Sequence, residues 1–180
     1  MSLQMIVIEM TQKFTTAWGH QAEQLVEEYL GKIGDKIGAQ SGGVMRVTPC
    51  MGSMGFISSW PDPDPENGGS RGLNQYDWLL GHLQSGNGFY YSPGTWPAEA
   101  GNERDLFAQW GCPSVICTPI LRNELNGFAF WGSEDTPTWG MRELGGLKQV
   151  GNIFGIALDK MGKKGRLWQK ALLYLVESQK

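Results

Sequence analysis

The sequence predicts an α+β domain built around an antiparallel sheet. Two pairs of short apolar runs, each pair joined by a turn, are typical of β-hairpins, whose strands are antiparallel. Longer segments near both ends repeat apolar residues every three or four positions, as amphipathic helices do. The chain has 180 residues, 41% of them hydrophobic and 18% charged, which suits one domain with its own core.

The first half of the chain is expected to contain a helix, a hairpin and a loop. The helix presents one apolar face that includes Trp18 and Leu25, and Gly38 ends it. The expected elements are a helix over residues 14–37, hairpin strands over 44–50 and 55–60, and a loop rich in proline and glycine over 61–72.

The second half again combines helices with short strands. Asn102 and Thr138 are suitable N-cap residues for two of these helices. The expected elements are a helix over residues 73–83, a strand over 89–91, a turn over 96–100, a helix over 103–110, hairpin strands over 114–121 and 127–132, and a final helix over 139–161. Whether this helix breaks at Gly162 or continues through Leu175 stays open, because each interior glycine costs a helix about 1 kcal/mol relative to alanine.

Charge and composition argue against several classes of function. The net charge is −3 at pH 7, whereas phosphate binding needs clustered lysine and arginine, so nucleic acid is not an expected partner. No apolar run reaches the roughly 18 residues that span a bilayer, so we expect no membrane contact and a soluble, cytoplasmic protein. Three cysteines and two histidines, unsuitably spaced, predict no metal site.

Residues 96–158 carry a series of short motifs in a recognisable order. They are Trp96-Pro97, Glu103-Arg104, the strand from Gly111 to Pro119, Gly127 in the returning strand, and Trp139 before Glu143-Leu144. This series resembles the second half of a GAF domain, the small-molecule sensor module of bacterial signalling proteins. The resemblance covers residues 37–158. It implies a central antiparallel sheet of six strands, with the terminal helices on one face and a ligand pocket under helices and loops on the other.

The resemblance divides the chain into three parts. Residues 14–161 are expected to form the GAF-like sensor domain, including both terminal helices. Residues 1–13 are expected to form an N-terminal extension, and its Met1-Ser2-Leu3 start is typical of residues added by cloning. Residues 162–180 are expected to form a basic helical extension that leads toward an output domain in a longer protein.

The resemblance also implies regulation and no catalysis. A small organic ligand would favour one state of the pocket, and the terminal helices would pass the change to a covalently linked output domain. The apolar faces of residues 14–37 and 144–161 exceed what one sheet face covers, so we expect a homodimer through these helices. Two alternatives stay open: a stand-alone free methionine sulfoxide reductase of the same fold, and a ligand-free dimerisation module.

The expected pocket is rich in aromatic side chains, because eight tryptophans are many for this length. Flat rings suit a closed pocket for an apolar or ring-bearing ligand, although any single tryptophan is more often a core residue. Arg104 is the candidate for binding an acidic group, with exposed pairing to Glu99 or Asp105 as its alternative role. The candidate ligand-binding residues are Trp60, Trp78, Tyr90, Trp96, Arg104, Phe107, Trp110 and Cys117.

The cysteines and motifs support no cofactor. Some GAF domains attach a bilin through a cysteine followed by histidine, but here proline follows Cys112 and threonine follows Cys117. The signature of cyclic-nucleotide-binding relatives is absent, and no motif supports haem. Cys112 and Cys117 are expected on opposite faces of one strand, too far apart for the thiol pair of a reductase. We therefore expect buried, unreactive thiols.

Overall fold

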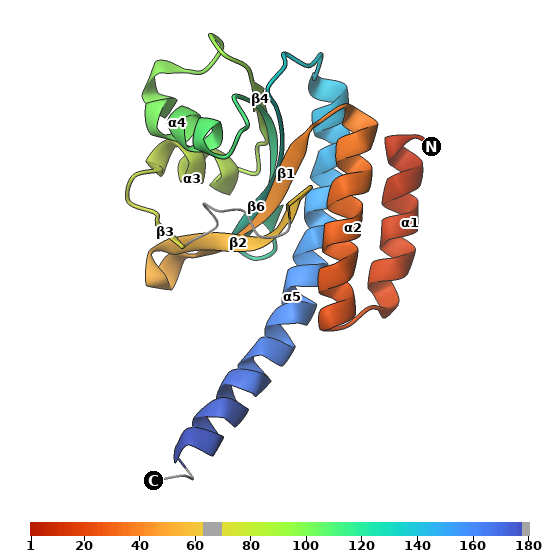
Figure 1. The fold of residues 1–180 in the computed structure, drawn as a ribbon, viewed down its shortest axis with the longest axis vertical. Helices are drawn as coiled ribbons and strands as arrows, with labels where there is room; N and C mark the ends of the chain where they lie inside the picture. Colours follow the sequence, from red (N-terminus) through yellow and green to blue (C-terminus); the bar gives the residue numbers. More distant parts are fainter. Residues whose placement is uncertain (63–69, 178–180) are drawn as a thin grey trace.

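A central sheet separates two layers of helices (Figure 1). The computed structural model describes residues 1–62 and 70–177, with side chains described through residue 161. One face is covered by α2 (His20–Ile37) and α5 (Met141–Glu177), on which α1 (Leu3–Thr16) packs, and the other by α3 (Asp77–Gln84) and α4 (Gly101–Gln109). The predicted α+β class, with the terminal helices on one face, is confirmed.

The sheet has six strands among the described residues, paired antiparallel in the order β3-β2-β1-β6-β5-β4. Their bounds are β1 (Ser41–Thr48), β2 (Ser53–Trp60), β3 (Arg71–Gly72), β4 (Phe89–Tyr91), β5 (Ser114–Leu121) and β6 (Leu125–Ser133). Both predicted hairpins are confirmed, β1–β2 around the short helix η1 (Pro49–Met51) and β5–β6. β3 was not predicted, since two residues carry no periodicity. Residues 63–69 of the predicted loop and 178–180 of the predicted extension lie outside the described residues.

Each face of the sheet has its own core. Successive side chains of a strand point to opposite faces, and the central strands are covered on both. The core facing α1, α2 and α5 takes from the sheet Val44, Ile116, Ile120, Ala129 and Trp131. The core facing α3 and α4 takes Met45, Val47, Val115, Cys117, Phe128 and Phe130. This double coverage explains why β5 is an almost continuous buried run.

The predicted helix over residues 14–37 is two helices, so the prediction was wrong at its N-terminal end. Gly19 has φ 52° and ψ −121°, a backbone conformation that glycine adopts more readily than other residues. α1 therefore ends at Thr16, and α2 begins at His20. Trp18, which the helical pattern placed on the buried face, is 53% exposed in the connection.

Residues 3–13, which the sequence analysis assigned to an extension, form most of α1. This helix buries Ile6, Val7, Met10 and Phe14 against α2 and α5. Its C-terminal end is held from α5, because the Lys160 ammonium donates hydrogen bonds to the carbonyl oxygens of Phe14 and Thr15. The last carbonyls of a helix lack partners within it, so this lysine satisfies two of them.

A polar cluster also joins α1 to α2. The Tyr29 hydroxyl donates to a carboxylate oxygen of Glu9 at 2.6 Å. The ammonium groups of Lys13 and Lys32 each lie 3.2 Å from the same oxygen. These donors, Tyr29 first, lower the pKa of Glu9 from 4.5 to about 2.

Neither predicted N-cap residue caps its helix. α4 begins at Gly101, directly after the short helix η2 (Ala98–Ala100), and the Asn102 side chain instead donates to the Gln75 carbonyl at 3.0 Å. α5 begins at Met141 rather than after Thr138. At its start, the carboxylate of Glu143 accepts a hydrogen bond from the Gly140 N–H at 3.0 Å.

The N-terminal end of α3 is capped from α4. The carboxylate of Glu103, only 2% exposed, accepts a hydrogen bond from the Leu79 N–H at 3.1 Å. The first N–H groups of a helix lack partners within it and carry partial positive charge, which a carboxylate satisfies. Glu103 therefore fastens the two helices of this layer to each other.

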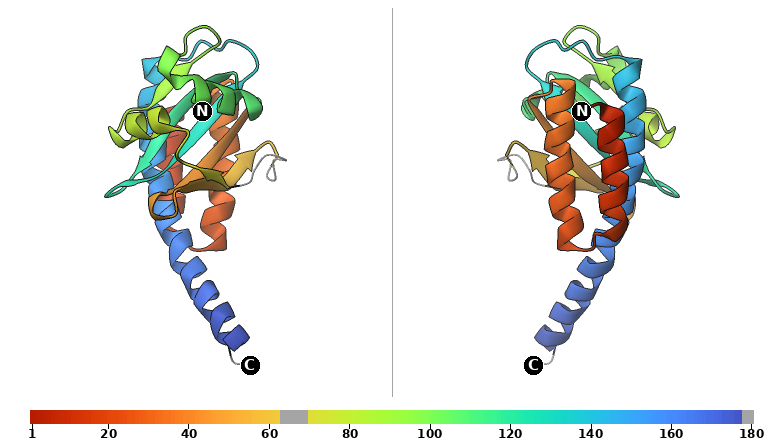
Figure 2. Two further views of the ribbon diagram at one scale, coloured as in Figure 1. Left: turned by 90° about the vertical axis from the view of Figure 1, so that its left-hand side faces the viewer. Right: turned by 90° about the vertical axis from the view of Figure 1, so that its right-hand side faces the viewer.

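α5 lies directly on β5. A Cβ added at Gly151 would lie 2.4 Å from the Pro119 carbonyl oxygen, so only glycine permits this separation without a shift. The helix then continues through Gly162 to Glu177 without a break and projects beyond the rest of the molecule (Figures 1 and 2). The backbone thus settles the choice between a break and continuity that the sequence left open.

Replacing Tyr29 by phenylalanine should raise the pKa of Glu9. Since folding lowers this pKa from 4.5 to about 2, the stabilisation is complete above pH 4.5 and is lost as the pH falls toward 2. Without the hydroxyl donor, the loss should be smaller and should be complete at a higher pH. Carboxyl NMR titration and thermal unfolding between pH 6 and pH 2 measure both effects. Glu27→Gln, an exposed change on α2, is the control. A Glu9 titration that is the same in Tyr29→Phe and the unmodified chain would contradict this account.

Gly151→Ala should destabilise the fold by about 1–3 kcal/mol, because the added methyl group meets backbone and neither element can yield without repacking. Gly145→Ala is the matched control on the same helix, where an added Cβ meets nothing within 4 Å. The control should be neutral or stabilising by up to about 1 kcal/mol, as alanine favours the helix. Urea unfolding compares the two. Equal effects at both positions would refute the proposed close contact.

Candidate functional site

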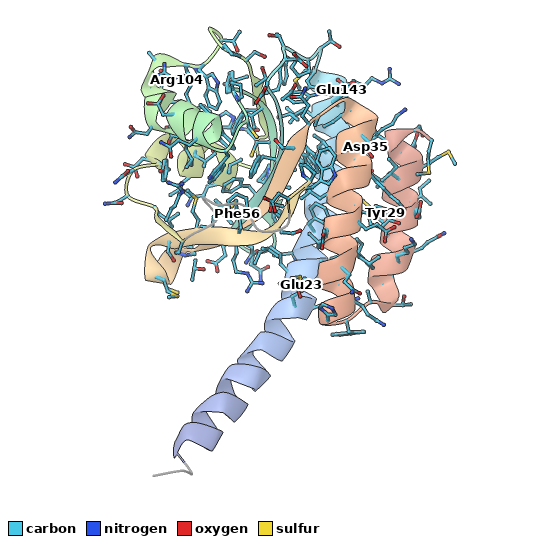
Figure 3. The ribbon with its side chains drawn as sticks, viewed as in Figure 1. Glu23, Tyr29, Asp35, Phe56, Arg104 and Glu143 are labelled. Atoms are coloured by element: carbon cyan, nitrogen blue, oxygen red, sulfur yellow. The ribbon has the colours of Figure 1, made fainter. Side chains whose placement is uncertain are left out.

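An aromatic cluster fills the space between the sheet and the layer of α3 and α4. Its members are Phe56, Trp78, Phe89, Tyr91, Trp96, Phe107, Trp110, Phe128 and Phe130. Neighbouring ring centroids lie 5.0–6.3 Å apart, in stacked, tilted and edge-to-face arrangements. Figure 3 shows Phe56 between the sheet and these helices. This is the face on which the sequence predicted a pocket.

Local periodicity brings these rings together. Phe89 and Tyr91 are two residues apart on β4 and so share a face, while Phe107 and Trp110 lie three apart at the end of α4. Phe130 rises from β6 to stack on Trp110, with 5.1 Å between centroids and 17° between planes. The cluster is therefore built from both the strands and the helices that cover them.

Five of the predicted ligand-binding residues meet in this region. Trp78, Trp96, Phe107 and Trp110 belong to the cluster, and Cys117 lies fully buried on β5 in the same core. Phe107 is also completely buried. Ring-to-ring packing is thus the role that the structure gives to most of these side chains.

Trp60, Tyr90 and Arg104 lie outside the cluster, although Trp60 lines a cavity beside it. The ring of Trp60 packs on α2, where a Cβ added at Gly34 would lie 2.5 Å from it. Tyr90 is 38% exposed and lines a groove of about 490 Å³ beside the edge strand β4. Arg104 points outward from α4 (Figure 3), and its guanidinium lies 3.1 Å from the Asp105 carboxylate. This is the alternative role that the sequence analysis considered for Arg104.

Arg71 is the cation of this face that the sequence analysis missed. It lies on β3, and its guanidinium carbon is 5.8 Å from the centroid of the Trp110 ring, within range of a cation–π interaction. No ion pair in the described part of the chain includes Arg71. In the sequence, Arg71 is a single arginine beside a glycine-rich loop, and Trp110, the ring that it contacts, is distant in the chain.

Within residues 1–62 and 70–161, three donors on this face lack acceptors. Nε of Arg71 and the indole Nε1 atoms of Trp96 and Trp110 are shielded from solvent and have no hydrogen-bond partner there. Buried N–H groups are nearly always paired in native proteins, so such a group calls for an explanation. Chemically, the face can donate hydrogen bonds to an acceptor that enters it.

A cavity of about 160 Å³ opens at the C-terminal end of α4, beside the aromatic cluster. Its lining residues are Ser41, Gly42, Phe56, Ser59, Trp60, Pro61, Asp62, Gln109, Trp110, Cys112 and Phe130. An apolar cavity of about 150 Å³ is known to hold one benzene molecule. The opening therefore has room for a single ring, whereas the neighbouring space is occupied by the protein's own side chains.

The cysteines are placed differently from the prediction. Cys112 precedes β5 instead of belonging to it, and its side chain shares the α3–α4 core with Cys117, so the expectation of opposite faces was wrong. Burial raises the pKa of Cys112 to about 11, although a hydrogen bond with Ser41 opposes this. Burial also raises the pKa of Cys117 well above its ordinary value. Both remain thiols at neutral pH, which disfavours nucleophilic sulfur chemistry. Cys50 is exposed in η1.

Two absences within the described residues bear on other classes of site. Within residues 1–62 and 70–177, no group of three or more His, Cys, Asp or Glu side chains is placed to hold a metal ion. Among the helices described there, none combines the length and the apolar character that crossing a membrane requires.

The fold, unlike the sequence, has clear counterparts among known proteins. No protein-family model matches the sequence, and no curated protein matches it. The phycocyanobilin-bound GAF domain from a cyanobacterial phytochrome matches with a TM-score of 0.72 at 13% identity, covering 91% of this chain and 97% of that one. The GAF domain of a phosphoenolpyruvate-protein phosphotransferase from Coxiella burnetii gives a TM-score of 0.72 at 12% identity, over 92% and 97%.

A third match comes from a two-component sensor histidine kinase of Bacillus halodurans. Its GAF domain gives a TM-score of 0.57 at 13% identity and covers 76% of this chain and 95% of that one. Identities this low establish the fold and nothing finer. Because the likeness extends over most of each chain, the protein has the GAF fold, as the motifs in residues 96–158 predicted.

Proposed function

We propose that this chain is a regulatory sensor domain, in which a ligand at the aromatic cluster changes the position of α5. The observation that carries the proposal is the placement of β5 between the two. Val115 and Cys117 face the core of the cluster, while Ile116 and Ile120 face the core that contains α5. Protein interiors are close-packed, so repacking on one side of a strand is transmitted to the other.

The geometry of α5 suits the transmission of such a change. Its contact with β5 at Gly151 is too close to absorb a shift of the strand. From there the helix runs to Glu177, well beyond the domain (Figure 2). A helix rises about 1.5 Å per residue, so a small tilt at the contact becomes a larger displacement at the far end. An output domain beyond α5 would receive that displacement.

The structural neighbours support a signalling role. They are GAF domains from a phytochrome, a phosphotransferase and a sensor histidine kinase. We propose a small ring-bearing organic ligand rather than a bilin for this chain. Although one neighbour is phycocyanobilin-bound, Cys112 and Cys117 are buried thiols with raised pKa values, which opposes covalent attachment.

A ligand-free dimerisation module is the second candidate. It is favoured by the rings of Phe89, Phe107 and Phe130, which are at most 3% exposed and fill much of the space where a ligand would lie. Under this alternative, the aromatic cluster is simply a core. A methionine sulfoxide reductase gains no such support, because its chemistry needs accessible thiolates.

We further propose that the sensor is a homodimer through its terminal helices. The outer surface of α1 exposes Met5 and Ile8, which are 57% and 56% accessible, with Met1 just before the helix at 61%. These positions follow the three- and four-residue spacing of one helix face. A second copy of the same surface would bury them through a symmetric contact.

The sensor proposal predicts that a ligand at the cluster changes α5. Indole and other small ring compounds, screened by tryptophan fluorescence and melting temperature, should include at least one that binds. Hydrogen exchange with that compound should then change in β5 and in residues 141–161 of α5, because the two elements touch. Hydrogen exchange in η1 at Cys50, which β1 and β6 separate from β5 in the sheet, should not change. If no ring compound alters fluorescence or melting temperature, the dimerisation module becomes the better account.

The dimer proposal predicts that Ile8→Glu converts a dimer into a monomer, since it places a charge in the apolar contact. Light scattering at micromolar concentration gives the mass directly. Met51→Glu is the matched control, because Met51 is 76% exposed but lies in η1, away from α1. A monomer mass for the unmodified chain would contradict the proposal.

A further inference from the structure

The two faces of the sheet treat buried indole groups differently. On the face covered by α1, α2 and α5, the Trp131 N–H donates to the Leu30 carbonyl at 2.9 Å and the Trp139 N–H to the Ile37 carbonyl at 2.8 Å. On the aromatic face, the buried N–H groups of Trp96 and Trp110 have no acceptor among the residues that the structure describes. The same donor is therefore satisfied on one face and left unmet on the other.

A positive charge accompanies the unmet indoles. The Arg71 guanidinium lies over the Trp110 ring, and its buried Nε also lacks an acceptor. The carboxylate of Glu103, buried on the same side of the sheet, already accepts the N–H of Leu79. In the described part of the chain, Arg71 forms no ion pair with any carboxylate. An acceptor with a negative charge would pair both with the indole N–H of Trp110 and with the guanidinium of Arg71.

A cavity at Trp110 sets the size of such a group. Of the three donors, Trp110 is the one whose side chain lines the cavity of about 160 Å³. Phe56 and Phe130 provide further aromatic wall, with centroids 5.1 Å from that of Trp110. One aromatic ring fits this volume and finds favourable ring contacts there.

We propose that this site binds a small aromatic carboxylate. The ring occupies the cavity lined by Phe56, Trp110 and Phe130, and the carboxylate accepts hydrogen bonds from Arg71 and the Trp110 N–H. A planar carboxylate matches the planar fork of a guanidinium, and its single negative charge balances the positive charge of one arginine. The inference rests on the proposed sensor function and specifies the class of its ligand.

Benzoate and its neutral analogue benzamide test this inference by calorimetry and tryptophan fluorescence. Benzoate should bind the unmodified chain more tightly than benzamide does. Arg71→Met keeps the aliphatic contact with Trp110 but removes the charge, and should weaken benzoate binding by about tenfold or more. Trp110→Phe keeps a ring but loses the donor and should weaken it several-fold. Arg104→Met removes an exposed arginine of the same layer and should have no effect.

The outcomes separate this inference from the sensor proposal. Benzoate binding that Arg71→Met leaves unchanged overturns the inference, as does equal binding of benzoate and benzamide. In either case a ring compound still binds and the sensor proposal stands. If neither probe binds and the wider screen of ring compounds is also negative, both proposals fail. Should Arg71→Met unfold, Arg71→Lys keeps the charge without the planar fork and should give an intermediate loss.

Discussion

The contact between α5 and β5 is the interaction on which the rest of the structure depends. β5 contributes to both cores, so whatever fixes its position fixes the aromatic cluster and the bundle of terminal helices together. Gly151 allows the helix backbone to rest on the Pro119 carbonyl, and α1 and α2 then pack against α5. A larger residue at this one position would separate the helices from the sheet.

Indole N–H groups are hydrogen-bonded on one side of the sheet, whereas those on the other side lack acceptors among the described residues. The terminal helices are fastened by hydrogen bonds that reach across elements, from Lys160 to α1 and from Trp131 and Trp139 to α2. The covering layer is fastened at Glu103, yet the indoles beside it keep unused donors. Among the described residues the hydroxyl groups of Ser114 and Thr118 are also buried without a partner, so the difference between the two faces concerns their indole groups.

The sequence predicted the fold well because its cues are local. Hairpins, amphipathic helices and the motif order in residues 96–158 each depend on neighbouring residues, and these gave the α+β class, both hairpins and the two layers of helices. Gly19 was a weaker cue, since a single glycine within an apolar pattern is compatible with a continuous helix. Asn102 failed as a cap because η2 runs directly into α4 at Gly101, and Thr138 failed because α5 begins only at Met141, where Glu143 accepts from the Gly140 N–H.

The candidate site was harder to predict because its geometry is tertiary. Composition indicated an aromatic face, and Trp78, Trp96, Phe107 and Trp110 do meet there. It could not show that Trp60 packs on α2, that Arg104 pairs with its sequence neighbour, or that Arg71 reaches Trp110. Each of these depends on which side of the sheet a residue faces and on what lies opposite it. A shift of one residue in strand register reverses the side of the sheet that a residue faces, and the residues opposite it are known only from the assembled fold.

The two glycines on the inner surface of α5 also restrict how that helix can move. Gly151 and Gly155 are four residues apart, so they form a narrow bare strip along one side of the helix, which rests on the end of β5 and the turn after it. Rotation about the helix axis would turn the bulkier neighbours of these glycines into the strand. The strip therefore makes rotation of α5 about its own axis a costly motion, because side chains would take the place of bare backbone against the strand.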